Sequence, residues 1–318
     1  MIASVVVDNL LSAPVIAFVV AIIATLARFD LRLPESLYPI LSAYLLLAIG
    51  IKGGKALADA DPAEVWMPVI GAVLVGVLTP LVAFAAMRFL GRIDTVNASA
   101  LAAHYGSVSA VTFTVVLATL EASDISYEGF VTGLLAILEV IGILVGLLLA
   151  GGSSSGAGWR EAVGEVVRGR SVALLVGGLV IGGVVGAERL APTDPLFVGL
   201  FTGALTLFLL ELGVVAAERL RDVSSAGWRL VALGVAVPIV NGSIGAVLGA
   251  LSGLSTGGVA VLATLAASAS YIAAPAAVRI ALPKASPGLY VTASLGITFP
   301  FNIVVGIPIY VSIAKALT

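Results

Sequence analysis

The sequence of 318 residues contains no cysteine and a single histidine, and only 11% of its residues are charged. Without cysteine the chain can form neither disulfides nor thiolate metal or redox sites. A soluble domain carries about 25% charged residues, so the charge content is too low for one. The net charge of −2, with no basic face in the sequence, argues against nucleic-acid binding. These absences point to a membrane protein.

Sequence motifs of catalysis are also missing. There is no nucleophile elbow, phosphate-binding loop, zinc signature or pair of catalytic carboxylates, so we predict neither an enzyme nor a resident cofactor. His104 has no acidic neighbour at ligand spacing, so we interpret it as a cavity-lining or packing residue and predict no metal site. The N-terminus lacks the basic segment of a cleaved signal peptide, and we expect it to lead into the first span.

What the sequence has is apolar residues, which make up 60% of the chain and occur in long runs. A helix that crosses a bilayer needs roughly 20 of them. The pattern therefore predicts an all-α polytopic membrane protein with ten transmembrane helices, at about 10–28, 36–56, 65–89, 98–120, 128–150, 171–187, 196–217, 228–251, 256–281 and 289–316.

The chain divides into two similar halves of five spans, residues 1–150 and 171–318, joined by a linker at 151–170. The strings LAAHYGSVSAVTF (101–113) and LATLAASASYIAA (262–274) both start with Leu-Ala and contain Ser-x-Ser, with equivalent positions 161 apart. Pro80 likewise aligns with Pro238 within flanking matches. Because five spans is an odd number, the second half is inverted in the membrane, which is a transporter architecture.

The distribution of basic residues predicts the orientation. Twelve of the 16 Lys and Arg residues fall in the connections after spans 1, 3, 5, 7 and 9. Cytoplasmic loops carry the excess of positive charge, so this side is cytoplasmic and both termini are extracytoplasmic. We expect the protein to be integral to the plasma, or inner, membrane.

The two serine strings predict broken helices in spans four and nine. If the helices break near Tyr105–Gly106 and Ala266–Ala267, new half-helices start at the Ser-x-Ser pairs, and their positive ends meet in mid-membrane. Serine hydroxyls and free backbone N–H groups there could hold a small anion without a buried cation. The candidate substrate-binding residues are Tyr105, Gly106, Ser107, Ser109, Ala267, Ser268, Ser270 and Tyr271. The alternative is that the serines only bond to the preceding turn and the tyrosines only pack.

Four further polar residues in the spans are candidate sodium ligands: Glu139, Asn241, Thr298 and Asn302. A carboxylate in mid-span costs on the order of 3 kcal/mol, so Glu139 is a functional candidate. Carboxylate, amide and hydroxyl oxygens are the ligands a hard cation prefers. The alternatives are a protonated Glu139 bonded to a neighbouring helix and asparagines that join helices. Glu211 is a weaker candidate because it lies nearer the cytoplasmic end of its span.

The strings HYGSVSAVTF (104–113) and ASASYIAAPAA (267–277), within ten spans in two inverted halves, resemble the SbtA-type sodium-dependent bicarbonate transporters. The resemblance covers essentially the whole chain. It implies a core domain of spans 3–5 and 8–10 and a gate domain of spans 1, 2, 6 and 7. It also implies sodium-coupled bicarbonate uptake, a homotrimer and regulation by a PII-like cytoplasmic protein. Bicarbonate contacts would fall on Gly106, Ser107, Ser109, Ser268 and Ser270.

The residues by themselves indicate a carrier of a small anion, and the resemblance adds bicarbonate. We therefore expect a sodium–bicarbonate symporter that works by alternating access. Three alternatives stay open: a Na⁺/H⁺ antiporter, a sodium-coupled carrier of a larger organic anion, and a membrane sensor that binds without transport.

Overall fold

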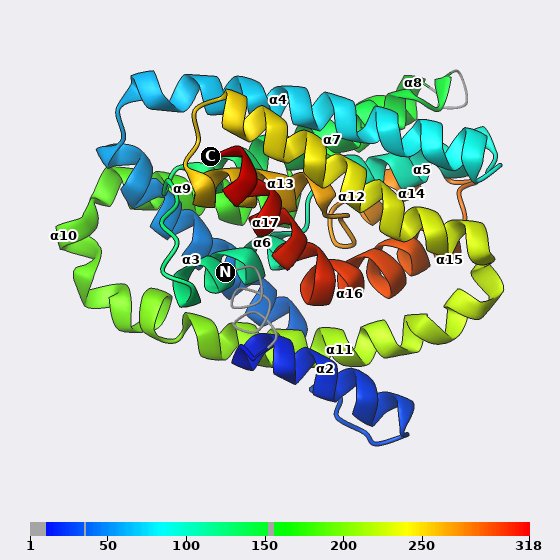
Figure 1. Ribbon diagram of the computed structural model, residues 1–318, viewed down its shortest axis with the longest axis horizontal. Helices are drawn as coiled ribbons and strands as arrows, with labels where there is room; N and C mark the ends of the chain where they lie inside the picture. Colours follow the sequence, from blue (N-terminus) through cyan, green and yellow to red (C-terminus); the bar gives the residue numbers. More distant parts are fainter. Residues whose placement is uncertain (1–10, 35, 152–155) are drawn as a thin grey trace.

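The computed structural model describes residues 11–34, 36–151 and 156–318, and no strand occurs in these ranges (Figure 1). The first half of the chain contains α2 Ala13–Leu26, α3 Leu37–Asp59, α4 Pro62–Ala85 with a π-helical end Ala86–Leu90, α5 Thr95–Gly106, α6 Ala110–Ala122 and α7 Val131–Leu148. Part of the predicted linker, residues 152–155, lies outside the described residues.

The second half begins with an amphipathic helix and ends in a helix interrupted by π-helical turns. Its elements are α8 Gly156–Val167, α9 Arg170–Val185, α10 Ala187–Leu190, the turns Ala191–Thr193 and Pro195–Gly199, α11 Phe201–Ala226, α12 Trp228–Leu251, α13 Thr256–Ala267, α14 Ala274–Ala281, α15 Pro287–Val291, η5 Thr292–Thr298, α16 Phe299–Phe301, η6 Asn302–Gly306 and α17 Ile307–Leu317.

By length and composition, seven helical segments of the described chain can cross a membrane, or eight if α8 and α9, which meet at 43°, form one span. The apolar helices α2 and α13 are shorter. Large apolar side chains are exposed on the outer helices, for example Trp66 and Ile70 on α4 and Val184 on α9, as a lipid environment requires. The protein is thus a polytopic α-helical membrane protein.

The segment that contains the first serine pair lies in the middle of the molecule. In the most apolar stretch of Thr95–Ala122, 94% of the residues are buried, compared with 39% for the helix Pro62–Leu90. Figure 1 shows α4 and α12 crossing one side of the molecule and α11 running along the opposite rim beside α2. The broken segments are therefore shielded from lipid by their neighbours.

Two pairs of outer helices pack through glycine. On α3, a Cβ atom at Gly54 would lie 2.2 Å from the carbonyl oxygen of Leu179 on α9. On α11, a Cβ atom at Gly213 would lie 2.5 Å from the carbonyl oxygen of Phe18 on α2. The absence of a side chain at these positions allows the helix backbones to approach closely.

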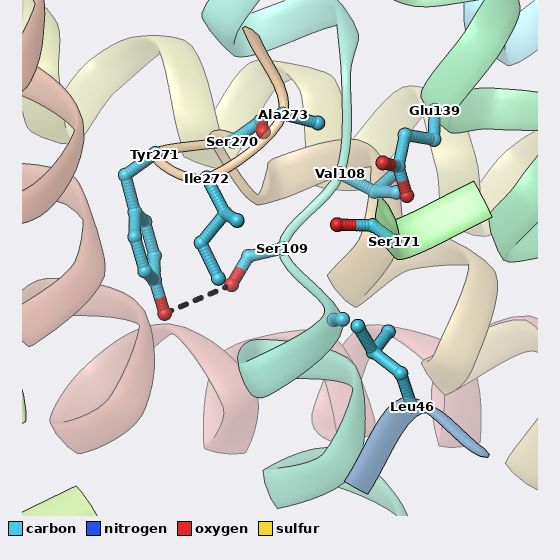
Figure 2. A pocket seen from close by; sticks show the side chains of 10 residues that line it. Leu46, Val108, Ser109, Glu139, Ser171, Ser270, Tyr271, Ile272 and Ala273 are labelled. Carbon is cyan, nitrogen blue, oxygen red and sulfur yellow. Dashed lines mark hydrogen bonds between the residues drawn. The ribbon is translucent and has the colours of Figure 1, made fainter. Parts of the chain in front are cut away.

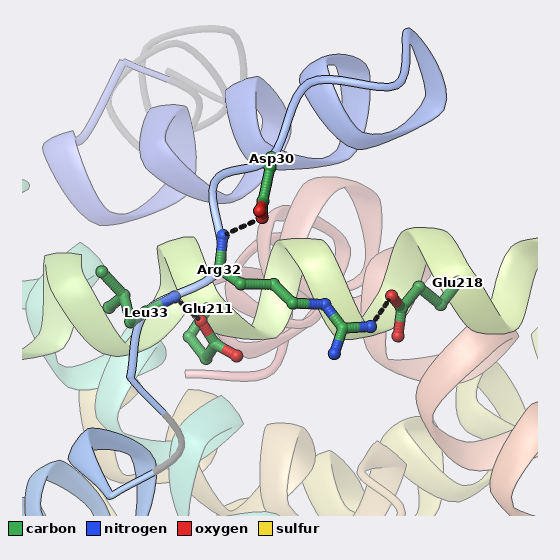
Figure 3. Close-up of polar contacts among 5 residues, drawn as sticks. All are labelled: Asp30, Arg32, Leu33, Glu211 and Glu218. Carbon is green, nitrogen blue, oxygen red and sulfur yellow. Dashed lines mark hydrogen bonds and ion pairs between the residues drawn. The ribbon is translucent and has the colours of Figure 1, made fainter.

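The connection between α2 and α3 is fastened to α11 by polar contacts (Figure 3). The Arg32 guanidinium forms an ion pair with Glu218, and the Leu33 N–H donates to Glu211 Oε2 at 2.9 Å. Arg32 N–H also donates to Asp30 Oδ1 at 3.1 Å within the connection. Glu211, the weaker sodium candidate, is thus engaged by the backbone of this connection.

Candidate substrate and ion site

Both serine strings interrupt helices. Helix α5 ends at Gly106, and Ser107 then adopts an extended conformation before α6 starts at Ala110. Ser109 caps α6, because its Oγ accepts the Thr112 N–H at 3.2 Å. In the second half α13 ends at Ala267, and the extended Ser268 follows. These ends coincide with the breaks that the sequence predicts at residues 105–106 and 266–267. The prediction that a new half-helix starts at each Ser-x-Ser pair is correct for α6 but wrong for the second pair, because α14 starts only at Ala274.

The two interruptions contact each other, although about 160 residues separate them. The backbone N–H of Ser109 donates to Ser268 Oγ at 2.9 Å, and the N–H of Ser270 donates to the carbonyl oxygen of His104 at 2.8 Å. All four serines of the two pairs are buried, with no more than 4% of their surface exposed. The interrupted segments therefore cross inside the protein and are joined by hydrogen bonds in both directions.

Glycine makes the close approach at this crossing possible. A Cβ atom at Gly106 would lie 2.6 Å from Pro80 Cβ, and one at Gly142 would lie 1.8 Å from the Gly106 carbonyl oxygen. Helices α4 and α7 thus press directly against the last residue of α5. A larger residue at either glycine would displace the interruption.

A small cavity adjoins the crossing, with a volume of about 10 Å³, roughly the room for one water molecule (Figure 2). It is lined by Leu46, Val108, Ser109, Ala110, Glu139, Ser171, Ser270, Tyr271, Ile272 and Ala273. Figure 2 shows Glu139 and Ser171 on one side, Tyr271 on the other and Ser109 between them. The Ser109 hydroxyl donates to the Tyr271 hydroxyl at 3.5 Å. Hydroxyl groups and one carboxyl group therefore face the same space.

Of the eight predicted substrate residues, three line this cavity: Ser109, Ser270 and Tyr271. The other five belong to the same crossing but do not line it. The Tyr105 hydroxyl instead shares a hydrogen bond of 2.7 Å with Thr298 Oγ1 on η5. Ser107 Oγ is buried and has no hydrogen-bond partner among the described residues. The eight predicted substrate residues thus lie at one crossing, but only three of them face the cavity.

The four predicted sodium ligands have different partners. Glu139 lies on the cavity wall, only 3% exposed, and its Oε1 has no partner among the described residues. Thr298 Oγ1 donates to the Gly234 carbonyl oxygen at 2.7 Å. Asn302 donates to the Ala267 carbonyl oxygen at 2.9 Å and accepts from the Tyr310 hydroxyl at 2.9 Å. Thr298 and Asn302 therefore brace the crossing, whereas Glu139 faces it.

Asn241 has a different environment from the other amide. Its Nδ2 donates to the Thr79 carbonyl oxygen on α4 at 3.4 Å, and its fully buried Oδ1 has no partner among the described residues. A buried oxygen without a partner is unfavourable, so this atom is still available as a cation ligand. The Asn241 side chain thus joins α12 to α4 through its Nδ2 and keeps its Oδ1 as an acceptor for another ligand.

His104 is fully buried and makes both a hydrogen bond and an aromatic contact. Its Nδ1 lies 2.7 Å from the Ala100 carbonyl oxygen, and its ring stacks on Tyr290 with the centroids 4.4 Å apart. Since a carbonyl can only accept, Nδ1 carries the proton and Nε2 is a lone-pair acceptor. The backbone carbonyl oxygen of His104 accepts a hydrogen bond from the Ser270 N–H. The sequence does not predict this contact, because a backbone contact does not depend on the residue type.

Sequence reasoning also missed Ser171 and Leu46, which bring α9 and α3 to the cavity. A single serine in a glycine-rich span carries no motif, and its role follows only from where α9 packs. Within the described part of the chain, no group of three or more His, Cys, Asp or Glu side chains could hold a metal ion.

Buried broken helices that meet beside a polar cavity define the class of polytopic membrane transporters. The sequence profile of the Na⁺-dependent bicarbonate transporter superfamily matches residues 13–315, almost the whole chain, and the protein belongs to this superfamily. No curated protein matches the sequence. Sodium as a co-substrate and bicarbonate as the transported anion fit the family, and the protein is a transporter in a lipid bilayer.

Proposed function

We propose that this protein is a secondary transporter that carries bicarbonate into the cell together with sodium, by alternating access. The observation that best supports this proposal is a pair of hydrogen bonds that joins two interrupted helices beside a polar cavity. The Ser109 N–H donates to Ser268 Oγ, and the Ser270 N–H donates to the His104 carbonyl oxygen. Family membership supports the choice of sodium and bicarbonate.

The anion would be held by neutral donors. No Lys or Arg lines the cavity, whereas Ser109 and Ser270 do, next to the first turn of α6. The first backbone N–H groups of a helix and its positive dipole end favour an anion. Neutral donors hold the anion weakly enough to release it, which suits a transporter better than a buried ion pair would.

The carboxyl group of Glu139 offers a physical reason for coupling to sodium. An ionised Glu139 and a bicarbonate ion in one small cavity repel each other, because charges interact strongly where water is scarce. A sodium ion between them would remove this repulsion, so each ion would raise the affinity for the other. Moving a monovalent anion into a negative-inside cell costs about 2.3 kcal/mol per 100 mV, and one sodium ion cancels that cost.

We further propose ten spans in two inverted halves, with helices α2, α3, α9 and α11 as the gate domain and the remaining long helices as the core domain. The repeat is supported by α5 and α13, which both start and end 161 positions apart and both have 12 residues. The extracytoplasmic termini, the homotrimer and the PII-like regulator remain predictions from the charge count and the resemblance.

The position of Glu139 also supports one alternative. A carboxyl group on the cavity wall could exchange a proton for sodium, as an antiporter requires. A sensor would bind the same ions without moving them.

The function is tested by reconstituting the purified protein in proteoliposomes and measuring uptake of labelled bicarbonate with an inward sodium gradient. We expect concentrative uptake that disappears when choline replaces sodium. Sodium-driven proton efflux without bicarbonate uptake would establish the antiporter. Uptake of taurocholate-like anions without uptake of bicarbonate would establish the carrier of a larger organic anion. Binding without flux would establish the sensor.

A further inference from the structure

A larger cavity lies away from the crossing, between the end of α2, the connection to α3, and α11. Its volume is about 640 Å³, within the range of roughly 300–1,000 Å³ that is usual for small-molecule sites. The residues that line it are Thr25, Leu26, Arg28, Phe29, Asp30, Leu31, Arg32, Val214 and Glu218. None of them lines the cavity beside the crossing, so the two cavities have separate walls.

Arg28 ends α2 in a backbone conformation that favours glycine. Its φ is +70°, its N–H donates to the Thr25 carbonyl oxygen at 3.1 Å, and the Phe29 N–H donates to the Ala24 carbonyl oxygen at 2.9 Å. Glycine is the usual residue at this position of a helix end, because a Cβ atom strains the left-handed backbone. The exposed Arg28 side chain lines the cavity, and its guanidinium has no hydrogen-bond or ion-pair partner within the described part of the chain. A charged donor is therefore available to a ligand.

The charged side chains that line this cavity have both signs. Arg32 is paired with Glu218, as Figure 3 shows, so these two side chains neutralise each other. Asp30 lies on the same connection as Arg28, and its Oδ1 accepts the Arg32 N–H at 3.1 Å. An ionised carboxylate can accept several hydrogen bonds, so Asp30 can accept more than this one. The cavity thus offers one cation, Arg28, and one anion, Asp30, to an occupant.

The rim of the cavity is apolar and exposed. Leu26 and Phe29 line the cavity with 49% and 69% of their surface exposed, and Ile23 in the preceding turn of α2 is 62% exposed. On a protein that crosses a bilayer such side chains face lipid, and the change to charged residues at the end of α2 marks the level of the lipid headgroups. Acyl chains can therefore pack on Leu26 and Phe29 while a headgroup enters the cavity.

We propose that this cavity binds the headgroup of an aminophospholipid, with the phosphate on Arg28 and the primary ammonium on Asp30. Arginine pairs well with phosphate through its planar fork of N–H groups. A primary ammonium donates N–H bonds to a carboxylate, which the quaternary ammonium of a choline lipid cannot do. A purely anionic lipid would satisfy Arg28 but would bring a second negative charge next to Asp30. The charges therefore favour phosphatidylethanolamine, and this inference does not depend on which ion the protein transports.

The test uses the purified full-length protein after detergent has removed bound lipid. Native mass spectrometry measures the apparent Kd of the first lipid that binds, for phosphatidylethanolamine, phosphatidylglycerol and phosphatidylcholine with the same acyl chains. We expect phosphatidylethanolamine to bind roughly tenfold more tightly than the other two, because only its headgroup forms both charged hydrogen bonds. Free phosphoethanolamine, which has the headgroup but no acyl chains, should not displace the lipid at equal concentration.

Two variants test the two contacts separately. Arg28→Gln should raise the Kd of phosphatidylethanolamine roughly tenfold, because a hydrogen bond between charged groups is lost. Asp30→Asn should remove the preference for phosphatidylethanolamine over phosphatidylglycerol. The matched control is Arg92→Gln, which should leave the Kd unchanged. Arg92 is also exposed and also follows a helical segment at a left-handed φ, of +56°, but it lies outside the cavity.

The outcomes decide each part of the proposal. Equal affinity for the three lipids, or an equal effect of Arg28→Gln and Arg92→Gln, would overturn the site. Tighter binding of phosphatidylglycerol would overturn the ammonium contact with Asp30, and with it the choice of an aminophospholipid. Displacement by free phosphoethanolamine at equal concentration would show that acyl chains do not contribute and would overturn a lipid as the occupant.

Discussion

At the scale of single residues, Glu139 is the side chain with the largest consequence for ion coupling. It is buried, it lies on the cavity wall with Ser109, Ser270 and Ser171, and its Oε1 has no partner among the described residues. Its charge would oppose anion binding unless a cation accompanies the anion. The coupling model therefore depends on this one carboxyl group.

We predict that Glu139→Gln weakens the sodium dependence of uptake, because the amide keeps the shape of the side chain but not the charge. The measurement is a sodium titration of bicarbonate uptake, with Glu211→Gln as the control. Glu211 is a span residue that accepts a hydrogen bond from Leu33 outside the cavity. A normal sodium titration for Glu139→Gln would assign Glu139 to structure.

At the scale of elements, the half-helices α5 and α13 are fixed at their N-terminal ends by the opposite half of the chain. The Ser255 N–H and hydroxyl at the start of α13 donate to the Glu128 carboxylate at 2.6 and 3.1 Å. The Ser286 N–H donates to Asn97 Oδ1 in the first turn of α5 at 2.7 Å. Each interrupted helix thus starts at a fixed point, which fixes the place where it ends in the crossing.

Asp94, the N-cap of α5, gives this element a pH dependence. Burial acts to raise the pKa of Asp94, but hydrogen bonds from the Asn97 side chain and backbone hold it below its ordinary value of 3.8. A lowered carboxyl pKa contributes stability above the ordinary value, and this contribution is lost as the pH falls through the lowered pKa.

We therefore predict that Asp94→Ala is less stable than the wild type by about 1 kcal/mol at pH 7, the typical value of a helix cap. The difference should shrink below about pH 4. Unfolding of the purified protein as a function of pH measures it. A difference that is constant down to pH 3 would show that the cap acts without its charge.

At the scale of the whole molecule, transport by alternating access requires the core domain to move against the gate domain. Helix α11 of the proposed gate touches η5 of the proposed core, where a Cβ atom at Gly296 would lie 3.2 Å from Arg219 Cβ. Disulfides join Cβ atoms about 3.5–4.5 Å apart, so this pair can be cross-linked with a small adjustment. The sequence has no cysteine of its own to interfere.

We predict that the double variant Arg219→Cys/Gly296→Cys loses uptake on oxidation and recovers it on reduction, because the disulfide locks the two domains together. The matched control is the wild-type protein, which has no cysteine that oxidation could cross-link. Its uptake should be unaffected by oxidation. Full uptake by the oxidised first variant would contradict the domain division.

The sequence alone was sufficient for the class of protein and for the positions of the two interruptions. Low charge and long apolar runs leave no stable soluble fold, and the repeated Ser-x-Ser strings identify residues 107–109 and 268–270 as the polar breaks. These are local properties, set by burial and backbone propensity, and they can be read along the chain.

The contacts across the molecule were decided only by the tertiary structure. The bond from Ser270 to His104, the free hydroxyl of Ser107 and the shared cavity of Glu139 and Ser171 join residues far apart in the sequence. Two strings that share Leu-Ala and Ser-x-Ser give no sign of which hydroxyl will be committed, because that depends on how the segments cross. Equivalent positions make inequivalent contacts here, because the Ser270 N–H donates to a backbone carbonyl oxygen whereas the Ser109 N–H donates to a serine hydroxyl.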